Sequence, residues 1–329
     1  MGGSNRIHRP HRGSLQFWPR KRAKRVLPRV RTWKTNFSSE PKLAGFIGYK
    51  VGMTHIILKE IDHLSPTKKL QDASYAATVI ECPPLKPLSI RFYKRNGNGL
   101  KLVGEHFASK VDKEVKRKTV SISEKKDVPE TYDDVRLVVY TQPKKTCSGK
   151  KTPDIMEIAI SGNDAKQKFE FAKSLLDKDI KVSEVLQDGQ LLDVHGVTKG
   201  KGFQGTVKRF GVKRRSHKSE KTVRGVGNLG SWTPKRVEFS VAQPGKMGFH
   251  LRTEYNKLCL IVSDKPEKIN QAGGFLNYGK VKNEYIIIKG SVPGARKRVL
   301  VLTQPLRPNS KLQIKPEIVY VSTSSKQGI

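Results

Sequence analysis

Two long stretches of this chain carry many positive charges and almost no negative ones, and such stretches cannot bury a hydrophobic core. The first precedes Glu40: it contains no acidic residue, while Arg and Lys are dense from Arg6 to Lys34. The second, from His195 to Arg252, has fourteen Lys or Arg residues and two acidic ones, a net charge of +12. Self-repulsion should keep both stretches extended until they meet an anion. The sequence therefore predicts a basic N-terminal arm over residues 1–42 and a basic extension over residues 195–252.

The net charge of the whole chain, +36 over 329 residues, indicates a polyanionic partner. A membrane surface is not expected, because the sequence shows no amphipathic helix, no lipidation motif and no apolar run of roughly 20 residues. Cys82, Cys147 and Cys259 are far apart and form no CxxC pair, so neither a zinc ribbon nor a disulfide framework is predicted. Nucleic acid in a reducing, cytoplasmic setting is the expected context.

Alternating apolar residues and glycine-marked bends predict strands on both sides of a mixed central region. The expected strands are short segments between Leu43 and Leu58, followed by Tyr75–Glu81, Leu88–Tyr93, Arg136–Thr141 and Ile155–Ile160. Apolar residues at helical spacing predict one helix over residues 105–118. A second helix should start at Asp164, whose side chain can cap it while Gln167 answers three residues later.

These elements predict a mainly β fold with an α/β insertion. Strands of residues 43–84 and 191–302 should form a β-barrel core, which the basic extension and a mixed α/β insertion over residues 85–190 interrupt. Residues 303–329 are expected to form a C-terminal tail.

The stretch from His195 to Arg252 has the composition of a loop that enters folded RNA. Its glycines cluster around residues 225–230 and 245–248, and Ser231-Trp232-Thr233-Pro234 lies between the clusters. Cations neutralise phosphates, glycine allows close backbone approach, and a tryptophan offers a stacking face. Trp232 could instead fill a core, but glycine and proline on both sides argue against a strand interior. In the arm, Phe17, Trp18 and Trp33 lie among arginines, which favours base stacking over a disordered solubilising tail.

One motif in this stretch imitates a dinucleotide-binding fingerprint. Residues 200–205 fit GxGxxG, and Glu220 lies where such folds place a ribose-binding acid. That motif requires a helix directly after the glycines, and the β-branched, glycine-broken residues 206–212 predict none. The lysines and backbone amides of this turn are more consistent with binding RNA phosphates. Neither GxSxG nor HExxH occurs and the eight histidines show no metal spacing, so we predict no catalytic residue, metal, cofactor or small-molecule substrate.

Several sequence blocks are distinctive when they are taken together: Pro19–Ala23, Phe46–Thr54, Val197–Gly205, Gly230–Pro234, Gly248–Thr253, Gly273–Phe275, Tyr278–Gly279 and Lys289–Arg298. Together they resemble the universal large-subunit ribosomal protein L-three family, in its archaeal or eukaryotic form. The resemblance covers nearly the whole chain and is weak around residues 85–155. Lys208 stands where eukaryotic members carry a methylated histidine, so that modification is not expected. The long eukaryotic C-terminal tail is missing, and an archaeal source fits best.

The resemblance implies a structural constituent of the large ribosomal subunit with a translation-factor-type β-barrel. Such a protein would bind the large-subunit (23S) rRNA near its 3′ end, nucleate early subunit assembly, and extend its basic loop towards the peptidyl-transferase centre. Its protein neighbours would be of the L-fourteen and L-twenty-four-e types. The residues predicted to bind RNA are Arg20, Lys21, Arg22, Lys199, Lys201, Lys208, Arg209, Lys213, Arg214, Arg215, Lys218, Arg224, Trp232, Lys235, Arg236, Lys246, His250, Arg252, Arg296, Lys297 and Arg298.

Two other classes of protein fit the sequence less well. A free RNA-modifying enzyme would need a cofactor pocket or an acid–base pair among scarce acidic residues, and the basic stretch offers neither. A DNA-coating protein would favour a compact basic face, whereas basic arms beside a barrel suit penetration of folded RNA.

Overall fold

The computed structural model of the chain describes residues 12–61, 70–97, 99–119, 128–219, 221–233, 235–312 and 317–327. Residues 1–11 of the predicted arm, Glu220 of the dinucleotide-like motif and Pro234 beside Trp232 lie outside the described residues. The chain divides into two units. The first contains Thr198–Leu251 together with the N-terminal stretch that ends at Lys24, and the second contains Arg25–Val197 and Arg252–Ile329.

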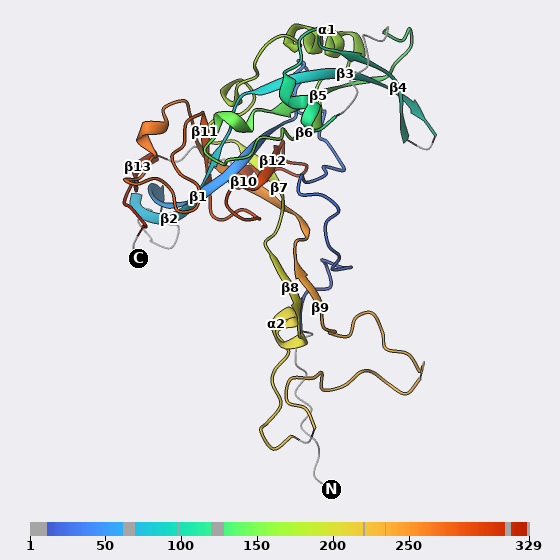
Figure 1. Cartoon of the computed structure of the whole chain (residues 1–329), viewed down its shortest axis with the longest axis vertical. Coiled ribbons are helices and arrows are strands. Elements are labelled where there is room, and N and C mark those ends of the chain that lie inside the picture. Colours follow the sequence, from blue (N-terminus) through green and yellow to red (C-terminus); the bar gives the residue numbers. More distant parts are fainter. Residues whose placement is uncertain are drawn as a thin grey trace. The chain divides into compact units, whose positions relative to one another are not determined.

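The larger sheet of the second unit joins strands from both ends of the sequence (Figure 1). Its strands are β1 (Gly45–Ile61), β2 (Leu70–Glu81), β7 (Leu191–Val197), β10 (Leu251–Ser263), β11 (Tyr285–Lys289), β12 (Val299–Thr303) and β13 (Glu317–Val321). Their order is β12-β7-β10-β11-β2-β1-β13, and β12 also pairs with β1, so six strands form a closed circuit. The segment expected to be a C-terminal tail thus supplies β13, which pairs antiparallel with β1.

Strand β1 is one continuous strand where the sequence predicted several short ones. The glycines that suggested bends serve another purpose. A Cβ on Gly48 would come within 2.5 Å of the Ile80 side chain on β2, so only glycine permits this close approach. Between Lys50 and Gly52 the register with β2 shifts, which bends β1 by a bulge without ending it.

The second sheet of this unit, built from the predicted insertion, is antiparallel with the order β4-β3-β5-β6. Its strands are β3 (Leu85–Asn96), β4 (Gly99–Phe107), β5 (Asp134–Thr141) and β6 (Ile155–Ala159). Helix α1 (Ala165–Leu175) lies beside β3 and β5 (Figure 1). Its predicted start is confirmed, because the Asp164 side chain accepts a hydrogen bond from the backbone N–H of Lys166 at 3.0 Å.

The helix predicted over residues 105–118 is wrong. Its first residues end strand β4, and only Lys113–Arg117 form a short 3-10 helix. Extended backbone at Asp112 separates the two. Val115 is nevertheless buried, in a cluster with Leu88, Val138 and Tyr140. The apolar residues reach the sheet without a continuous helix. Four further 3-10 helices span Pro143–Lys145, Val182–Glu184, Pro266–Lys268 and Ser310–Leu312.

The main hydrophobic core is shared by both sheets of the second unit. Phe46 and Tyr49 of β1 belong to the same buried cluster as Phe92 of β3 and Leu137 of β5. Trp33 was predicted to stack on RNA bases, but it packs against this cluster, where its ring is partly buried in the protein. The arm therefore does not act as one piece, because its second half supports the core. Another cluster joins side chains of β1, β2, β10 and β11.

A charged network crosses strands β3, β5 and β6 of the second sheet. Glu157 of β6 accepts hydrogen bonds from the Tyr93 hydroxyl at 2.7 Å and from the Arg136 guanidinium at 2.8 Å. Burial acts to raise the pKa of Glu157, but these hydrogen bonds and the nearby arginines outweigh it, so the pKa is lowered. Burial and the Glu157 carboxylate raise the pKa of Tyr93 to about 12.

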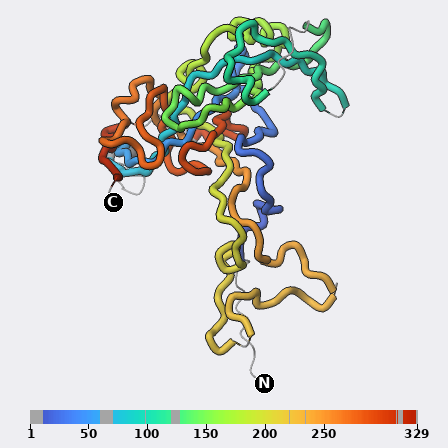
Figure 2. Tube along the Cα trace, in the orientation of Figure 1, coloured from blue at the N-terminus to red at the C-terminus, as the bar shows by residue number. Residues whose placement is uncertain are grey.

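The first unit has little regular structure. Strands β8 (Gly200–Gln204) and β9 (Gly245–Gly248) form an antiparallel ribbon, and α2 (Thr206–Phe210) follows β8 (Figure 1). The chain between α2 and β9 runs as long loops (Figure 2). Among the described residues of 198–251, the buried hydrophobic side chains are Phe210 and Ala242. The described part of this unit consequently lacks a hydrophobic core of its own, as its composition predicted.

Candidate nucleic-acid interface

The base of the ribbon is fixed by backbone contacts at Thr198 and His250. The N–H of Thr198 donates to the carbonyl of His250 at 2.9 Å, and the N–H of His250 donates to the Thr198 hydroxyl at 3.1 Å. Gly248 has φ +76°, and a Cβ there would lie 2.0 Å from the carbonyl oxygen of Lys199. Glycine is required at this position because the two strands approach so closely.

The arm attaches to the ribbon through His250. Its Nε2 accepts from the N–H of Gly248 at 3.1 Å, so Nδ1 carries the proton and donates to the carbonyl of Lys21 at 2.8 Å. The N–H of Ala23 donates to the carbonyl of Phe249 at 2.8 Å. His250 is 7% exposed, and both its ring nitrogens bond within the protein. We therefore remove His250 from the expected RNA-binding residues: it positions the arm.

Aromatic and cationic side chains hold the arm to α2. The rings of Trp18 and Phe210 lie edge-to-face, with 5.7 Å between their centroids. The guanidinium carbon of Arg20 lies 4.0 Å from the Phe210 ring centroid, and Nη1 of Arg20 donates to the carbonyl of Arg209 at 2.7 Å. Trp18 is thus half-buried against protein, and its predicted role as a base-stacking residue is replaced by packing within this unit.

Helix α2 corrects the expectation that no helix follows the GxGxxG glycines. It begins after Gly205 and ends at Gly211, whose φ of +71° is a left-handed C-terminal cap. Burial of Phe210 against the arm stabilises this single turn, a tertiary contact that local propensity does not reveal. The dinucleotide interpretation still fails. Strand β8 pairs antiparallel with β9, whereas the fingerprint belongs to a parallel βαβ unit.

Two arginines of the extension use donors to hold the loops. Arg209 donates from Nη1 to the carbonyl of Gln243 at 2.8 Å and from Nε to that of Lys246 at 3.2 Å. Arg215 donates from Nη2 to the carbonyl of Val226 at 2.5 Å. Burial, and then the charge of Arg20, lower the pKa of Arg209. Guanidinium–carbonyl bonds thus link loop segments that have few buried apolar side chains, and only the donors outside these bonds remain for a ligand.

The other cations of the extension are exposed. The ion pairs between described residues involve neither the described arm up to Lys24 nor the described part of Thr198–Leu251. The exposed cations in the described part of this unit are Arg12, Lys21, Arg22, Lys24, Lys199, Lys201, Lys208, Lys213, Arg214, Lys218, Lys221, Arg224, Lys235, Arg236 and Lys246. Such a surface has the composition of a phosphate-binding one.

Trp232 is 85% exposed, which excludes the core-filling alternative. Gly230 before it has φ +124°, and Lys235 after it has φ +62° and donates its N–H to the carbonyl of Trp232 at 2.8 Å. A tight turn therefore presents the indole to solvent. Phe239 nearby in sequence is also exposed, although its ring lies 6.3 Å from that of Trp18.

The second unit carries its own basic turn at Arg296–Arg298. The buried Lys50 ammonium donates to the carbonyl of Val292 at 2.6 Å, and the backbone of Lys50 exchanges hydrogen bonds with Lys297 and Arg298. Arg296 and Lys297 are exposed, whereas Arg298 donates to the carbonyl of Val197 at 3.2 Å. Arg252, the last extension residue of the predicted set, is partly buried on β10.

The chain matches a known protein family over nearly its whole length. The model of the family described as Ribosomal protein L3 matches residues 3–130 and 123–328. The large ribosomal subunit protein uL3 of Methanobrevibacter smithii is 43% identical over 337 residues, covering 98% of this chain and 99% of that protein. The protein of the same name from Methanocaldococcus jannaschii is 44% identical over 334 residues, with 98% of each chain covered. The chain belongs to the ribosomal protein L3 family.

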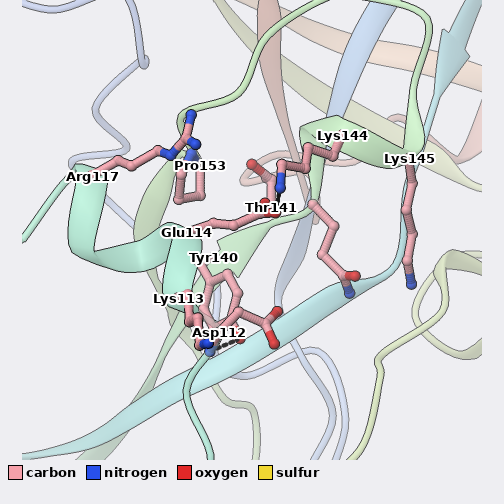
Figure 3. Close-up of a pocket in the computed structure, with 10 residues that line it drawn as sticks. Asp112, Lys113, Glu114, Arg117, Tyr140, Thr141, Lys144, Lys145 and Pro153 are labelled. Carbon is pink, nitrogen blue, oxygen red and sulfur yellow. Dashed lines mark hydrogen bonds and ion pairs between the residues drawn. The ribbon is translucent and has the colours of Figure 1, made fainter.

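The matching family model and the curated relatives are those of a ribosomal protein and not of an enzyme. A polar hollow of about 500 Å³ in the second unit is lined by cations and carboxylates (Figure 3). Lys144 pairs with Glu114 there, and Lys145 pairs with Asp179 at 3.4 Å. Among the described residues no His, Cys, Asp and Glu side chains cluster as a metal site would require. None of the helices described is long and apolar enough to span a bilayer.

The predicted RNA-binding set of this L3-family chain omits several exposed side chains, Phe203 and Lys221 among them. Phe203 is 72% exposed on β8, and Lys221 is exposed beside the other cations. Lys221 shares the composition that identified its neighbours, so the same criterion would have found it. Phe203 was read only as a variable position of GxGxxG, and no local signal distinguishes an exposed phenylalanine from a core residue.

Proposed function

We propose that this chain is a structural constituent of the large ribosomal subunit in the archaeal cytoplasm, bound directly to 23S rRNA. The observation that carries the proposal is the exposed set of extension cations without carboxylate partners in the described part of the first unit. Its curated relatives bear the name large ribosomal subunit protein uL3. Polyanionic RNA supplies the counter-charge that the chain itself lacks.

The finer features of the proposal rest on the family resemblance. The closed circuit of six strands fits a translation-factor-type barrel interrupted by the α/β insertion. In this role the chain binds rRNA near its 3′ end, nucleates early assembly, and extends the basic loop with Trp232 towards the peptidyl-transferase centre. The L-fourteen and L-twenty-four-e types are its protein neighbours. The RNA-binding residues are the predicted ones without His250. Arg209, Arg215 and Arg298 contribute only those N–H groups that are not already bonded to carbonyls of the protein.

Sedimentation of an affinity-tagged chain in a lysate tests the function directly. We expect near-complete comigration with large subunits, both in intact ribosomes and after lowering magnesium to separate the subunits. Comigration with DNA, or a large free pool that persists at low expression, would contradict the proposal. Adding purified components to an in vitro assembly in different orders tests the early role: late addition of this chain should reduce the yield of complete subunits.

A further inference from the structure

The ribbon β8–β9 presents an aromatic side chain that the protein itself does not use. Phe203 is 72% exposed and belongs to none of the hydrophobic clusters. No ring or cation of a described residue stacks on it, in contrast to Phe210, which carries Trp18 and Arg20. A large apolar side chain exposed in this way loses the free energy that burial would give it. Core packing does not hold Phe203, so the direction in which it leaves the ribbon is set by the local backbone.

A bulge provides that orientation. Gly200 pairs with Gly248 and Phe203 pairs with Lys246, so three steps along β8 oppose two along β9. Gly202 in the bulge has φ +68°, a conformation that side chains other than glycine rarely adopt. The side chain of Gln204 donates to the carbonyl of Lys201 at 2.6 Å and closes the bulge. Bulges redirect side chains, and this one turns Phe203 outward at a fixed position.

The surroundings of Phe203 select one kind of occupant. Its direct cross-strand partner is Lys246, which shares its face of the ribbon, and Lys201 and Lys199 are exposed nearby in sequence. An apolar protein surface docking here would have to bury these ammonium groups. A nucleotide matches both features, because its base stacks on the ring while its phosphates meet the lysines.

We propose that Phe203 is a base-stacking site for an unpaired RNA nucleotide, with Lys201 and Lys246 neutralising the adjoining phosphates. The site rests on the proposed rRNA binding and adds to it a specific residue and a specific ligand group, a single unstacked base. Trp232 and Phe203 are then two separate stacking positions of the extension, one on a loop and one on the ribbon.

Binding of the full-length chain to a 23S rRNA transcript tests the site. Phe203→Leu keeps an apolar side chain and removes the aromatic face, so binding should weaken roughly 5- to 150-fold, the range of one lost base–aromatic stack. Phe203→Tyr keeps the ring and should bind within about twofold of the unmodified chain. The slope of affinity against salt should be the same in all three, because no charge changes.

Tyr320→Leu is the matched control, since Tyr320 is a 51% exposed aromatic residue on β13 of the second unit. It should bind like the unmodified chain. Normal binding by Phe203→Leu would overturn the site while leaving the proposed function intact, as would equal weakening by Phe203→Tyr. A loss of thermal stability in Phe203→Leu that accounts for weak binding would also overturn it. If the unmodified chain fails to bind the transcript, the proposed function itself fails.

Discussion

Removing two exposed extension cations, Lys213 and Arg214, should flatten the salt dependence of RNA binding. A protein that neutralises about six to ten phosphates loses roughly three to five decades of RNA affinity when salt is raised from about 50 to about 200 mM. Each contact contributes about 0.7–0.9 to the slope of log affinity against log salt, so Lys213→Ala with Arg214→Ala should lower the slope by about 1.4–1.8. Over that fourfold range of salt, the variant should lose about one decade less affinity than the unmodified chain.

The choice of these two residues follows from the structure. The adjacent Arg215 also looks like a phosphate ligand in the sequence, but its guanidinium donates to the carbonyl of Val226, so its removal would disturb the loop as well as the charge. The matched control is Lys166→Ala with Lys173→Ala, which removes the same charge from exposed positions on α1. Binding isotherms at four or more salt concentrations give both slopes. An unchanged slope in the extension variant, or an equal change in the control, would refute contact between these cations and phosphate.

Three further outcomes follow from individual contacts. Trp232→Ala should leave melting of the free protein nearly unchanged but impair peptidyl transfer by reconstituted subunits; a large melting loss with normal transfer would refute its exposure to RNA. Trp18→Ala should speed amide hydrogen exchange at Ala23, whereas the exposed control Leu15→Ala should not, and equal rates would show that the Trp18 contact does not hold the arm. Glu157→Gln should lower the free energy of unfolding by about 1–3 kcal/mol at neutral pH. Because folding lowers the pKa of Glu157, the stabilisation by its carboxylate is present above the unfolded pKa of about 4.3 and is lost as pH falls through the folded pKa. If the difference in free energy of unfolding between the unmodified chain and Glu157→Gln persisted at acidic pH, this reasoning would be contradicted.

Local sequence patterns were enough to predict strands with alternating apolar side chains and a helix with a capping residue at its start. Strand β5 and helix α1 with Asp164 are of this kind, since each is specified by a few consecutive residues. Failures occurred where a contact distant in sequence decides the structure. Helix α2 depends on Phe210 meeting Trp18, and β1 runs through its glycines because β2 and β12 pair along it.

The candidate interface shows the same division. Composition alone predicted which segments would bear exposed charge, because solvated cations need no specific partner. Composition could not show that Arg215 and His250 bind carbonyl groups of the protein while Lys213 is exposed. The carbonyls that Arg215 and His250 bind belong to Val226 and Lys21, which lie elsewhere in the sequence. Assigning a donor to protein or to RNA requires knowing where every nearby acceptor lies.

The contacts that order the first unit are themselves charged, which connects its folding to RNA binding. The guanidinium carbons of Arg20 and Arg209 lie 4.0 and 5.1 Å from the centroid of the Phe210 ring, and the charge of Arg20 helps lower the pKa of Arg209. Two like charges on one ring oppose each other, so this packing is less favourable alone than beside an anion. A phosphate that binds the folded arrangement more tightly than the unfolded one stabilises it by linkage. If RNA is that anion, as proposed above, its binding stabilises the folded first unit, and amides such as that of Ala23 should exchange more slowly in the complex than in the free chain.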